Sequence, residues 1–499
     1  MKPVARRMVS TGLVLALTVP LAVACTKAEN KETEGERTLR IATTMYGGGE
    51  GENEYFRQQF TEVFEYANPN IKLEFVPVMD NSRFMYGGAP EPGEKMPDPY
   101  EKMKEVMQGS NPPDVVMVDF GQLPDLVQNN MLSPLDPMIQ KDKFDTSDYV
   151  PAVLDGIKGA ATDGKLYALA PTFSSSALIY NKKLFQDAGV EFPKDGMTWQ
   201  EVFDLAKRVT KPDGDKPVYG FNFNTGSGGD IFWSTQMYSQ PLQLRMWDDT
   251  GEHMTVDSDQ WEKVWSTIIQ LQKDKVMPEA IDYSQPGNRA KMMQPDQNNP
   301  FAYDDFMSGK LAMSVVYYGW LPQLINANKN AANIKGYNPI EWDVVSMPSH
   351  PEAPGVSGQI YMNGIMGINV KAHNPDDAWK FIKFINGDDW ARLKSGSSGQ
   401  LVSRKKHIKA PGGATFNIAA FYNTKPVAQN LNDYKIAREN PNIYSVQGLA
   451  QQNFMSALQG KISVRDALKK WQTDGDAMLK QLKENPTAPI GPHGISAEQ

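Results

Sequence analysis

Residues 163–205 read DGKLYALAPTFSSSALIYNKKLFQDAGVEFPKDGMTWQEVFDL, and this stretch decides the fold. Two short apolar runs within it, residues 166–170 and 177–180, predict strands that are buried on both faces. Between them, residues 171–176 (PTFSSS) predict a polar segment that crosses from one strand to the other. The pattern indicates an α/β protein with its strands packed inside.

Helix signals follow the second strand directly. Residues 181–188 predict a short helix, and Gly189 is a suitable C-cap because glycine adopts the left-handed conformation without strain. Thr198 and Glu201 have the spacing of a capping box, which predicts the start of the next helix.

These residues resemble the extracellular solute-binding proteins of ABC importers, in the carbohydrate-binding group that includes maltose-binding protein. The resemblance rests on DGKLYALAP, LIYN, LFQDAG and TWQE in this order, and on a second signature in residues 306–325, FMSGKLAMSVVYYGWLPQLI. It covers roughly residues 38–485. It implies an α/β, two-lobed fold, in which each lobe is a mostly parallel sheet flanked by helices and crossing segments form a hinge.

The resemblance also implies how the chain divides. Three crossings, near residues 172–176, 360–364 and 405–411, make both lobes discontinuous. The expected segments are 36–172 plus 362–405 for lobe one, and 177–360 plus 411–499 for lobe two.

Length and composition agree with a soluble protein of several domains. The chain has 499 residues, more than one ordinary hydrophobic core accommodates. Its residues are 40% hydrophobic and 22% charged, a globular balance. The formal net charge of −8 gives no indication of a basic surface for nucleic acid.

The N-terminus has the features of a lipoprotein signal peptide over residues 1–24. Lys2, Arg6 and Arg7 precede an apolar run that is too short to span a bilayer. The run ends in LAVAC, which resembles a bacterial lipobox and implies that Cys25 carries the lipid. Cys25 is the only cysteine, so no internal disulfide forms, and residues 25–37 are expected to be a polar tether. The alternative is an ordinary secretory signal with a chance cysteine.

Periodicity predicts how the chain opens. Residues 38–43 and 71–78 predict strands on either side of a helix that starts near Phe56, the beginning of a parallel sheet. Residues 114–118 (DVVMV) predict a further buried strand, and residues 219–223 are also typical of a strand.

Ligands of open α/β sheets bind beyond the carboxyl ends of the strands. Aromatic rings cover the flat faces of sugars, while Asp, Asn and Ser bind the hydroxyls. Trp320 is the strongest candidate, because it follows an apolar strand and resembles a position where sugar binders place a stacking aromatic. The other predicted ligand-binding residues are Trp233, Asp119, Trp247, Tyr46, Asn363, Asp230, Ser175 and Tyr361. A helix N-cap is the alternative role for Asp119.

Five of the ten tryptophans lie in helical patterns, which favours core packing for them: Trp199, Trp261, Trp265, Trp379 and Trp471. For Trp342 and Trp390, the sequence favours neither core packing nor ligand binding. Met residues near the expected cleft, Met45 and Met362, are compatible with a partly apolar ligand.

The sequence contains no HExxH, GxSxG or Walker A motif, and its five histidines have no metal-ligand spacing. No cofactor is expected, and residues 212–217 (PDGDKP) have too few ligands for a convincing calcium site. Adjacent Asp304 and Asp305 point apart in a regular element, unlike the opposed carboxyls of a glycosidase.

The main hypothesis is therefore a non-enzymatic, monomeric binding protein, anchored by lipid to the outer face of the cell membrane. It would deliver a sugar or oligosaccharide to ABC permease subunits, with no nucleic-acid partner. A secreted carbohydrate-active enzyme and a ligand sensor for a signalling partner are the alternatives.

Overall fold

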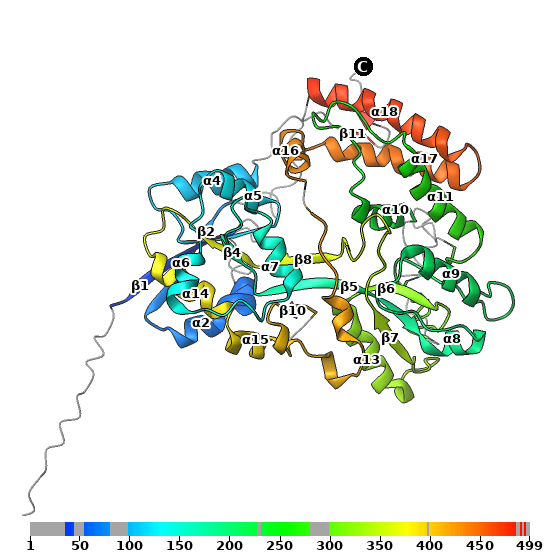
Figure 1. Ribbon diagram of the computed structural model, residues 1–499, viewed down its shortest axis with the longest axis horizontal. Helices are drawn as coiled ribbons and strands as arrows, with labels where there is room; N and C mark the ends of the chain where they lie inside the picture. The colour runs from blue at the N-terminus through cyan, green and yellow to red at the C-terminus, as the bar shows by residue number, and fades with distance from the viewer. Residues whose placement is uncertain are drawn as a thin grey trace, which may run out of the picture.

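The computed structural model describes residues 35–43, 54–79, 98–226, 231–279, 299–396, 399–428 and 430–485, and two short strands after them. Cys25, Tyr46 and Asp230 lie outside these residues, as do the signal peptide and most of the tether. Figure 1 shows two lobes, each built on its own sheet, with β5 and β8 running between them. The expected α/β, two-lobed class is therefore confirmed.

Lobe one contains a five-stranded sheet in the order β2-β1-β3-β9-β4. Its strands are β1 (Arg37–Thr43), β2 (Ile71–Pro77), β3 (Val115–Val118), β4 (Ala168–Leu169) and β9 (Ile365–Ile368). β1 pairs in parallel with β2 and β3, as the sequence predicts. β9 is antiparallel to both β3 and β4, because it returns from the other lobe. The sheet is thus mixed rather than mostly parallel.

Eight helical segments flank the sheet of lobe one in the described chain: η1 (Arg57–Thr61, π-helical), α2 (Glu62–Ala67), α4 (Pro99–Gln108), α5 (Gln122–Gln128), α6 (Asp136–Asp142), α7 (Pro151–Lys158), α14 (Pro375–Ile385) and α15 (Asp388–Lys394). Phe64 of α2 packs edge-on against Phe381 and Phe384 of α14, with ring centroids 5.0 and 5.4 Å apart. The two helices therefore share a core although more than 300 residues separate them.

Strand β5 (Thr172–Asn181) is the centre of the molecule. The expectation of a separate polar segment at residues 171–176 is wrong, because Thr172 to Ser176 continue the strand. Their backbone groups pair with β8 (Ile360–Asn363) and β10 (Leu401–Val402), which satisfies the polar backbone without a loop.

The second half of β5 belongs to lobe two, where it pairs with β6 (Met313–Tyr317) and β7 (Trp342–Val345). Both pairings are antiparallel, so this sheet also departs from the mostly parallel expectation. Residues 219–223 form isolated parallel bridges, Tyr219 with Leu311 and Asn222 with Ser314, instead of the predicted strand.

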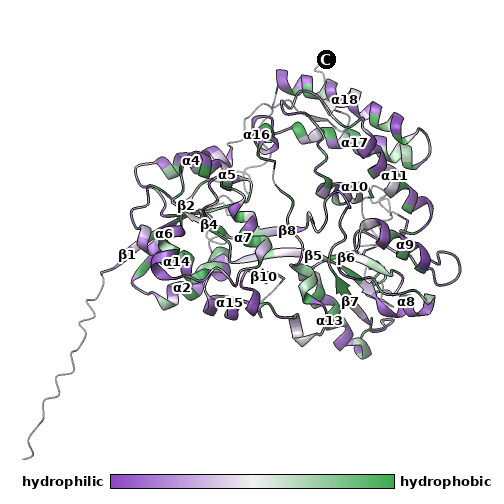
Figure 2. Ribbon diagram, in the orientation of Figure 1, coloured by the Kyte–Doolittle hydropathy of each residue, from purple (hydrophilic) through white to green (hydrophobic). Residues whose placement is uncertain are grey.

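The helices of lobe two and of the C-terminal part are α8 (Lys182–Ala188), α9 (Trp199–Val209), α10 (Ile231–Ser239), η2 (Gln240–Leu242), α11 (Asp259–Lys273), η3 (Tyr318–Trp320), α13 (Leu321–Lys329), η4 (Ala331–Asn333), η5 (Lys405–His407), η6 (Pro411–Gly413), η7 (Ile418–Phe421), α16 (Leu431–Glu439), η8 (Ile443–Ser445), α17 (Val446–Leu458) and α18 (Val464–Glu484). Two short strands, β11 (Ile490–Gly491) and β12 (Gly494–Ile495), pair after them. In Figure 2 the helices carry both hydrophobic and hydrophilic residues, as amphipathic helices that cover a core do.

The C-cap predicted at Gly189 and the capping box predicted at Thr198 and Glu201 are confirmed. Asn181 accepts a hydrogen bond from the backbone N–H of Leu184 at the start of α8, and Gly189 ends this helix with a φ of +66°. Thr198 and Glu201 form the reciprocal capping box of α9. The five tryptophans predicted to be core residues are all buried, and Trp265 stacks on Trp471 with centroids 5.5 Å apart. Trp390 is also buried.

Gly364 lies between β8 and β9, where the chain returns from one lobe to the other. Its φ is +66°, and a Cβ atom at this position would lie 2.6 Å from the ring of Phe60. Only glycine therefore allows this turn to pack so closely on lobe one.

Candidate functional site

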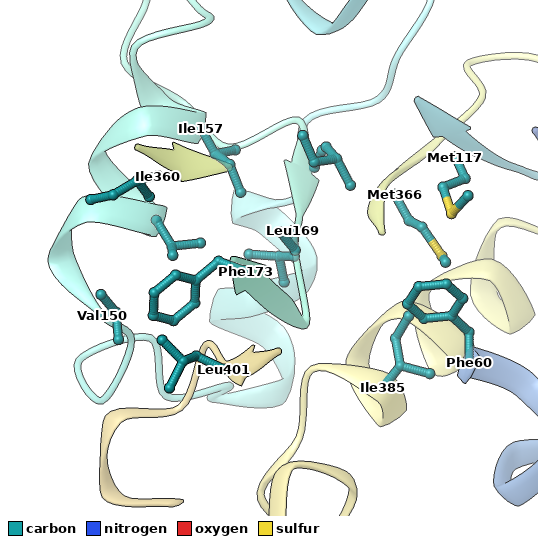
Figure 3. Packing of buried hydrophobic residues seen from close by; sticks show 14 of the residues in the cluster. Phe60, Met117, Val150, Ile157, Leu169, Phe173, Ile360, Met366, Ile385 and Leu401 are labelled. Atoms are coloured by element: carbon teal, nitrogen blue, oxygen red, sulfur yellow. The ribbon is translucent and has the colours of Figure 1, made fainter. Parts of the chain in front are cut away.

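The two faces of β5 differ in their surroundings. On one face, Phe173 packs in a buried cluster with Leu401 and Val150, which Figure 3 shows from close by. Ser175 points the same way, because side chains alternate along a strand. It is buried, and its hydroxyl donates to the carbonyl oxygen of Ser176 at 3.4 Å.

The other face of β5 carries Ser174 and Ser176 between two exposed aromatic rings. Strand register places Ser174 opposite Tyr361 of β8, and Ser176 opposite Tyr317 of β6. Cross-strand partners project from the same face of a sheet. Tyr361 is 53% exposed and Tyr317 is 60% exposed, although both lie in the middle of the molecule. We call this set, with Asn363, the crossing-strand face.

Polar groups complete the crossing-strand face. The Nδ2 atom of Asn363 donates to the Oγ atom of Ser174 at 3.0 Å. The hydroxyl of Thr172, one step along the same face, donates to the Oε1 atom of Gln400 at 2.9 Å. The face therefore offers the partly exposed Ser174 hydroxyl and Asn363 amide between two aromatic rings, whereas Thr172 and Ser176 are buried.

A second group lies where lobe one approaches α16. Asp119 follows β3, and its Oδ1 atom accepts from the backbone N–H of Gln122 at 2.9 Å, which fixes the turn before α5, whose N-cap is Gly121. The carboxylate also accepts from the hydroxyl of Tyr100, with distances of 3.2 and 3.3 Å to its two oxygens. Burial and the nearby Asp119 carboxylate raise the pKa of Tyr100.

Tyr434 of α16 lies next to this group, with its ring packed on Gly121. Burial raises the pKa of Tyr434, and the negative charge of Asp119 raises it further. Such interactions require the groups to lie near one another. Asp119 is thus brought close to α16, although more than 300 residues separate the two in the sequence.

The three tryptophan candidates have different positions. Trp233, in the first turn of α10, is 60% exposed. Trp247 is buried and packs edge-on against Tyr444, with centroids 5.4 Å apart. Trp320 is only 8% exposed and packs edge-on against Phe306 at 6.0 Å.

Sequence reasoning missed Tyr100, Tyr317, Tyr434 and Tyr444. Tyr317 had a usable signal, because it ends an apolar strand just before the Gly-Trp pair. Tyr434 and Tyr444 lie in a part of the chain that carries none of the quoted motifs, and only the folded chain brings Tyr434 near Asp119 and Tyr444 against Trp247.

Asp304 has a structural role that bears on the enzyme alternative. Its Oδ1 atom accepts from the backbone N–H of Met307 at 2.8 Å, and its Oδ2 atom accepts from the hydroxyl of Thr225 at 3.0 Å. Burial raises the pKa of Asp304 to about 6. The two carboxylate oxygens of Asp304 thus accept hydrogen bonds that stabilise a turn.

The residues that the structure describes hold neither a metal-binding cluster nor a membrane-spanning helix. Among them, no group of three or more His, Cys, Asp or Glu side chains is arranged to hold a metal ion. No helix in the same ranges has both the length and the apolar composition that a membrane span needs.

One known protein family matches most of this chain. Residues 47–392 match the family described as bacterial extracellular solute-binding protein. A binding protein of Brucella abortus (strain 2308) is 24% identical over 453 residues, which covers 89% of this chain and 93% of the relative.

Solved structures show the same fold. A sugar transporter protein from Rhizobium etli in an open conformation aligns with a TM-score of 0.58 and 19% identity, over 88% of this chain and 99% of the other. The sugar-binding protein MalE from Xanthomonas citri aligns with a TM-score of 0.56 and 18% identity, over 90% and 98%.

Proposed function

The chain belongs to the bacterial extracellular solute-binding protein family, and on this basis we propose that it captures a sugar or oligosaccharide between its lobes and delivers it to an ABC permease. The observation that carries the carbohydrate assignment is the crossing-strand face. There, Ser174 and Ser176 lie between the exposed rings of Tyr317 and Tyr361.

The chemistry of this face suits a carbohydrate. A sugar ring presents a flat C–H surface that packs on an aromatic ring, and its rim of hydroxyls both donates and accepts hydrogen bonds. The partly exposed Ser174 hydroxyl and the Asn363 amide supply both kinds of partner. The solved relatives from Rhizobium etli and Xanthomonas citri, described as sugar transporter and sugar-binding protein, support the same ligand class.

The remaining predicted ligand-binding residues belong to this proposal with different roles. We assign direct contacts to Tyr361, Asn363 and Trp233, whose side chains are exposed or half-buried. Asp119 would bind hydroxyls beside Tyr100. Tyr46 and Asp230, outside the described residues, stay predictions from their positions after a strand and before α10. The lobe boundaries given above are part of the same proposal.

A ligand screen tests the function. We expect one or more mono- or oligosaccharides to raise the melting temperature, because a ligand that binds only the native state adds RT ln(1 + [L]/Kd) to its stability. After long incubation, chromatography should recover the sugar unchanged. New products would indicate the enzyme alternative, and no response to any carbohydrate would contradict the proposed ligand class.

Membrane attachment gives a separate prediction. We propose that Cys25 carries the lipid and holds the protein on the outer face of the cell membrane, since two acyl chains anchor far better than one. Cys25→Ala should therefore leave the membrane fraction or accumulate with its signal peptide uncleaved. Lys27→Ala, which changes the same segment and keeps the thiol, is the control. If Cys25→Ala fractionates and migrates like the wild type, the anchor is not at this residue.

A further inference from the structure

One face of helix α16 packs against lobe two. Ile436 is buried in the core of lobe two, so close to Gly251 that a Cβ atom there would lie 2.6 Å from it. Arg245 donates to the Oδ1 atom of Asp433 from two nitrogens, at 3.1 and 2.7 Å. The helix is thus held firmly on this side.

The other face of α16 contacts lobe one. The Nη1 atom of Arg438 lies 3.3 Å from the Oδ2 atom of Asp125 in α5. The same guanidinium lies 5.4 Å from the ring centre of Tyr100 in α4. Tyr434, one turn before Arg438, packs on Gly121 at the start of α5, where a Cβ atom would come within 2.7 Å of its ring.

A cavity of about 230 Å³ remains at this junction. Tyr100, Gln128, Asn432 and Lys435 are among the residues that line it, and they come from both lobes. Figure 1 shows α16 between α5 of lobe one and α17 of lobe two. The contacts of α16 therefore bridge the two lobes separately from the strands that cross between them.

We propose that α16 is a latch, with Tyr434 seated on Gly121 and Arg438 paired with Asp125, that holds the lobes together at the mouth of the cleft. This inference rests on the proposed function, because it assigns the latch to the cleft that takes the ligand. Tyr434 and Arg438 are then positioning residues, which set affinity through the equilibrium between open and closed forms.

The latch would act by changing the populations of the open and closed forms of the two lobes. Two lobes joined by crossing strands open and close by hinge motion, and any contact made only in the closed form favours that form. When the competent form is partly populated, the apparent Kd is the intrinsic Kd divided by its fraction. The side chains of the Arg438–Asp125 ion pair are 21% and 27% exposed, and such a pair with an aromatic contact favours the closed form only modestly. Loss of the latch should therefore weaken affinity about 3- to 10-fold.

Gly121 gives a direct test. Its backbone is in the right-handed helical region, so alanine fits lobe one without strain and interferes only with Tyr434. Gly121→Ala should open the ligand-free protein. Pulsed EPR between spin labels on Gln108→Cys at the end of α4 and Gln459→Cys at the end of α17, with Cys25→Ser, measures the separation of the lobes.

A double-mutant cycle distinguishes the latch from local damage. Tyr434→Ala removes the ring, so Gly121→Ala should have no further effect on the distance in that background. An equal effect in both backgrounds would show that the alanine acts within α5, and the latch would be wrong.

The ion pair is tested with a matched control on the same helix. Arg438→Ala should lengthen the distance or broaden its distribution. Lys435→Ala also removes a cation from α16, but its ion-pair partner is Glu439 of the same helix, so the distance should stay unchanged. An Arg438→Ala distance equal to that of the wild type would overturn the role of the ion pair.

The readouts separate this inference from the proposed function. The distance is measured without ligand and tests the latch alone, whereas a sugar screen on the wild type tests carbohydrate binding. With a sugar found in that screen, Gly121→Ala should raise the Kd about 3- to 10-fold. Opening of the variant with an unchanged Kd would mean that the latch does not control the ligand site.

Discussion

Trp320→Ala is expected to lower the free energy of unfolding by about 3–5 kcal/mol, the usual cost of truncating a buried aromatic. Trp320 is 8% exposed, packs edge-on against Phe306, and belongs to the hydrophobic cluster that continues from lobe one across β5 into α13. Removal of the indole leaves a cavity that neighbouring side chains of a packed core fill only in part.

Urea denaturation followed by fluorescence measures the effect, and Tyr317→Ala is the matched control. Tyr317 lies three residues earlier and is 60% exposed, so its loss should cost less than about 1 kcal/mol. The sequence alone favoured Trp320 as a platform for a sugar ring. That role predicts the opposite pattern, a nearly unchanged midpoint with a large loss of affinity, and such a result would contradict the core assignment.

Much of the fold could be predicted because its signals are local. The capping box of Thr198 and Glu201 depends on residues three apart, and the left-handed Gly189 lies next to the helix that it ends. The buried strand at β3 was evident as a continuous apolar run. The order of the quoted motifs along the chain then indicated the family.

The crossing segment could not be predicted in the same way. Pro171 and a run of serines are typical of a loop, yet residues 172–176 form a strand because β8 and β10 supply partners from distant parts of the chain. Which serines face outward depends on register. Ser175 was chosen from its location, but the pairing turns it inward and places Ser174 and Ser176 between the tyrosines.

The group around α16 lay beyond sequence reasoning for a similar reason. Asp119 was identified from its place after a strand, whereas Tyr434 contacts the same region more than 300 residues later. A helix of nine residues with both polar and apolar positions gives no indication of which face meets lobe one. That information exists only in the tertiary contacts of Arg438 and Tyr434.

The crossing-strand face leads to the prediction with the largest effect on binding. Tyr361→Ala and Tyr317→Ala should each weaken sugar affinity by about 1–3 kcal/mol, roughly 5- to 150-fold, because each removes an aromatic surface for the C–H face of a ring. Both side chains are more than half exposed, so stability should change little. Titration calorimetry with a sugar found by the screen measures the two affinities.

Two controls distinguish stacking from a general disturbance of the sheet. Tyr317→Phe keeps the ring, so most of the affinity should remain, and the difference reports the hydroxyl alone. Ser175→Ala changes the opposite, buried face of β5 between the same neighbours, so it should leave the Kd unchanged. If both alanine variants bind the sugar as tightly as the wild type, the ligand does not rest on this face. In that case the exposed Trp233 would become the first aromatic to test, since it is 60% exposed at the start of α10.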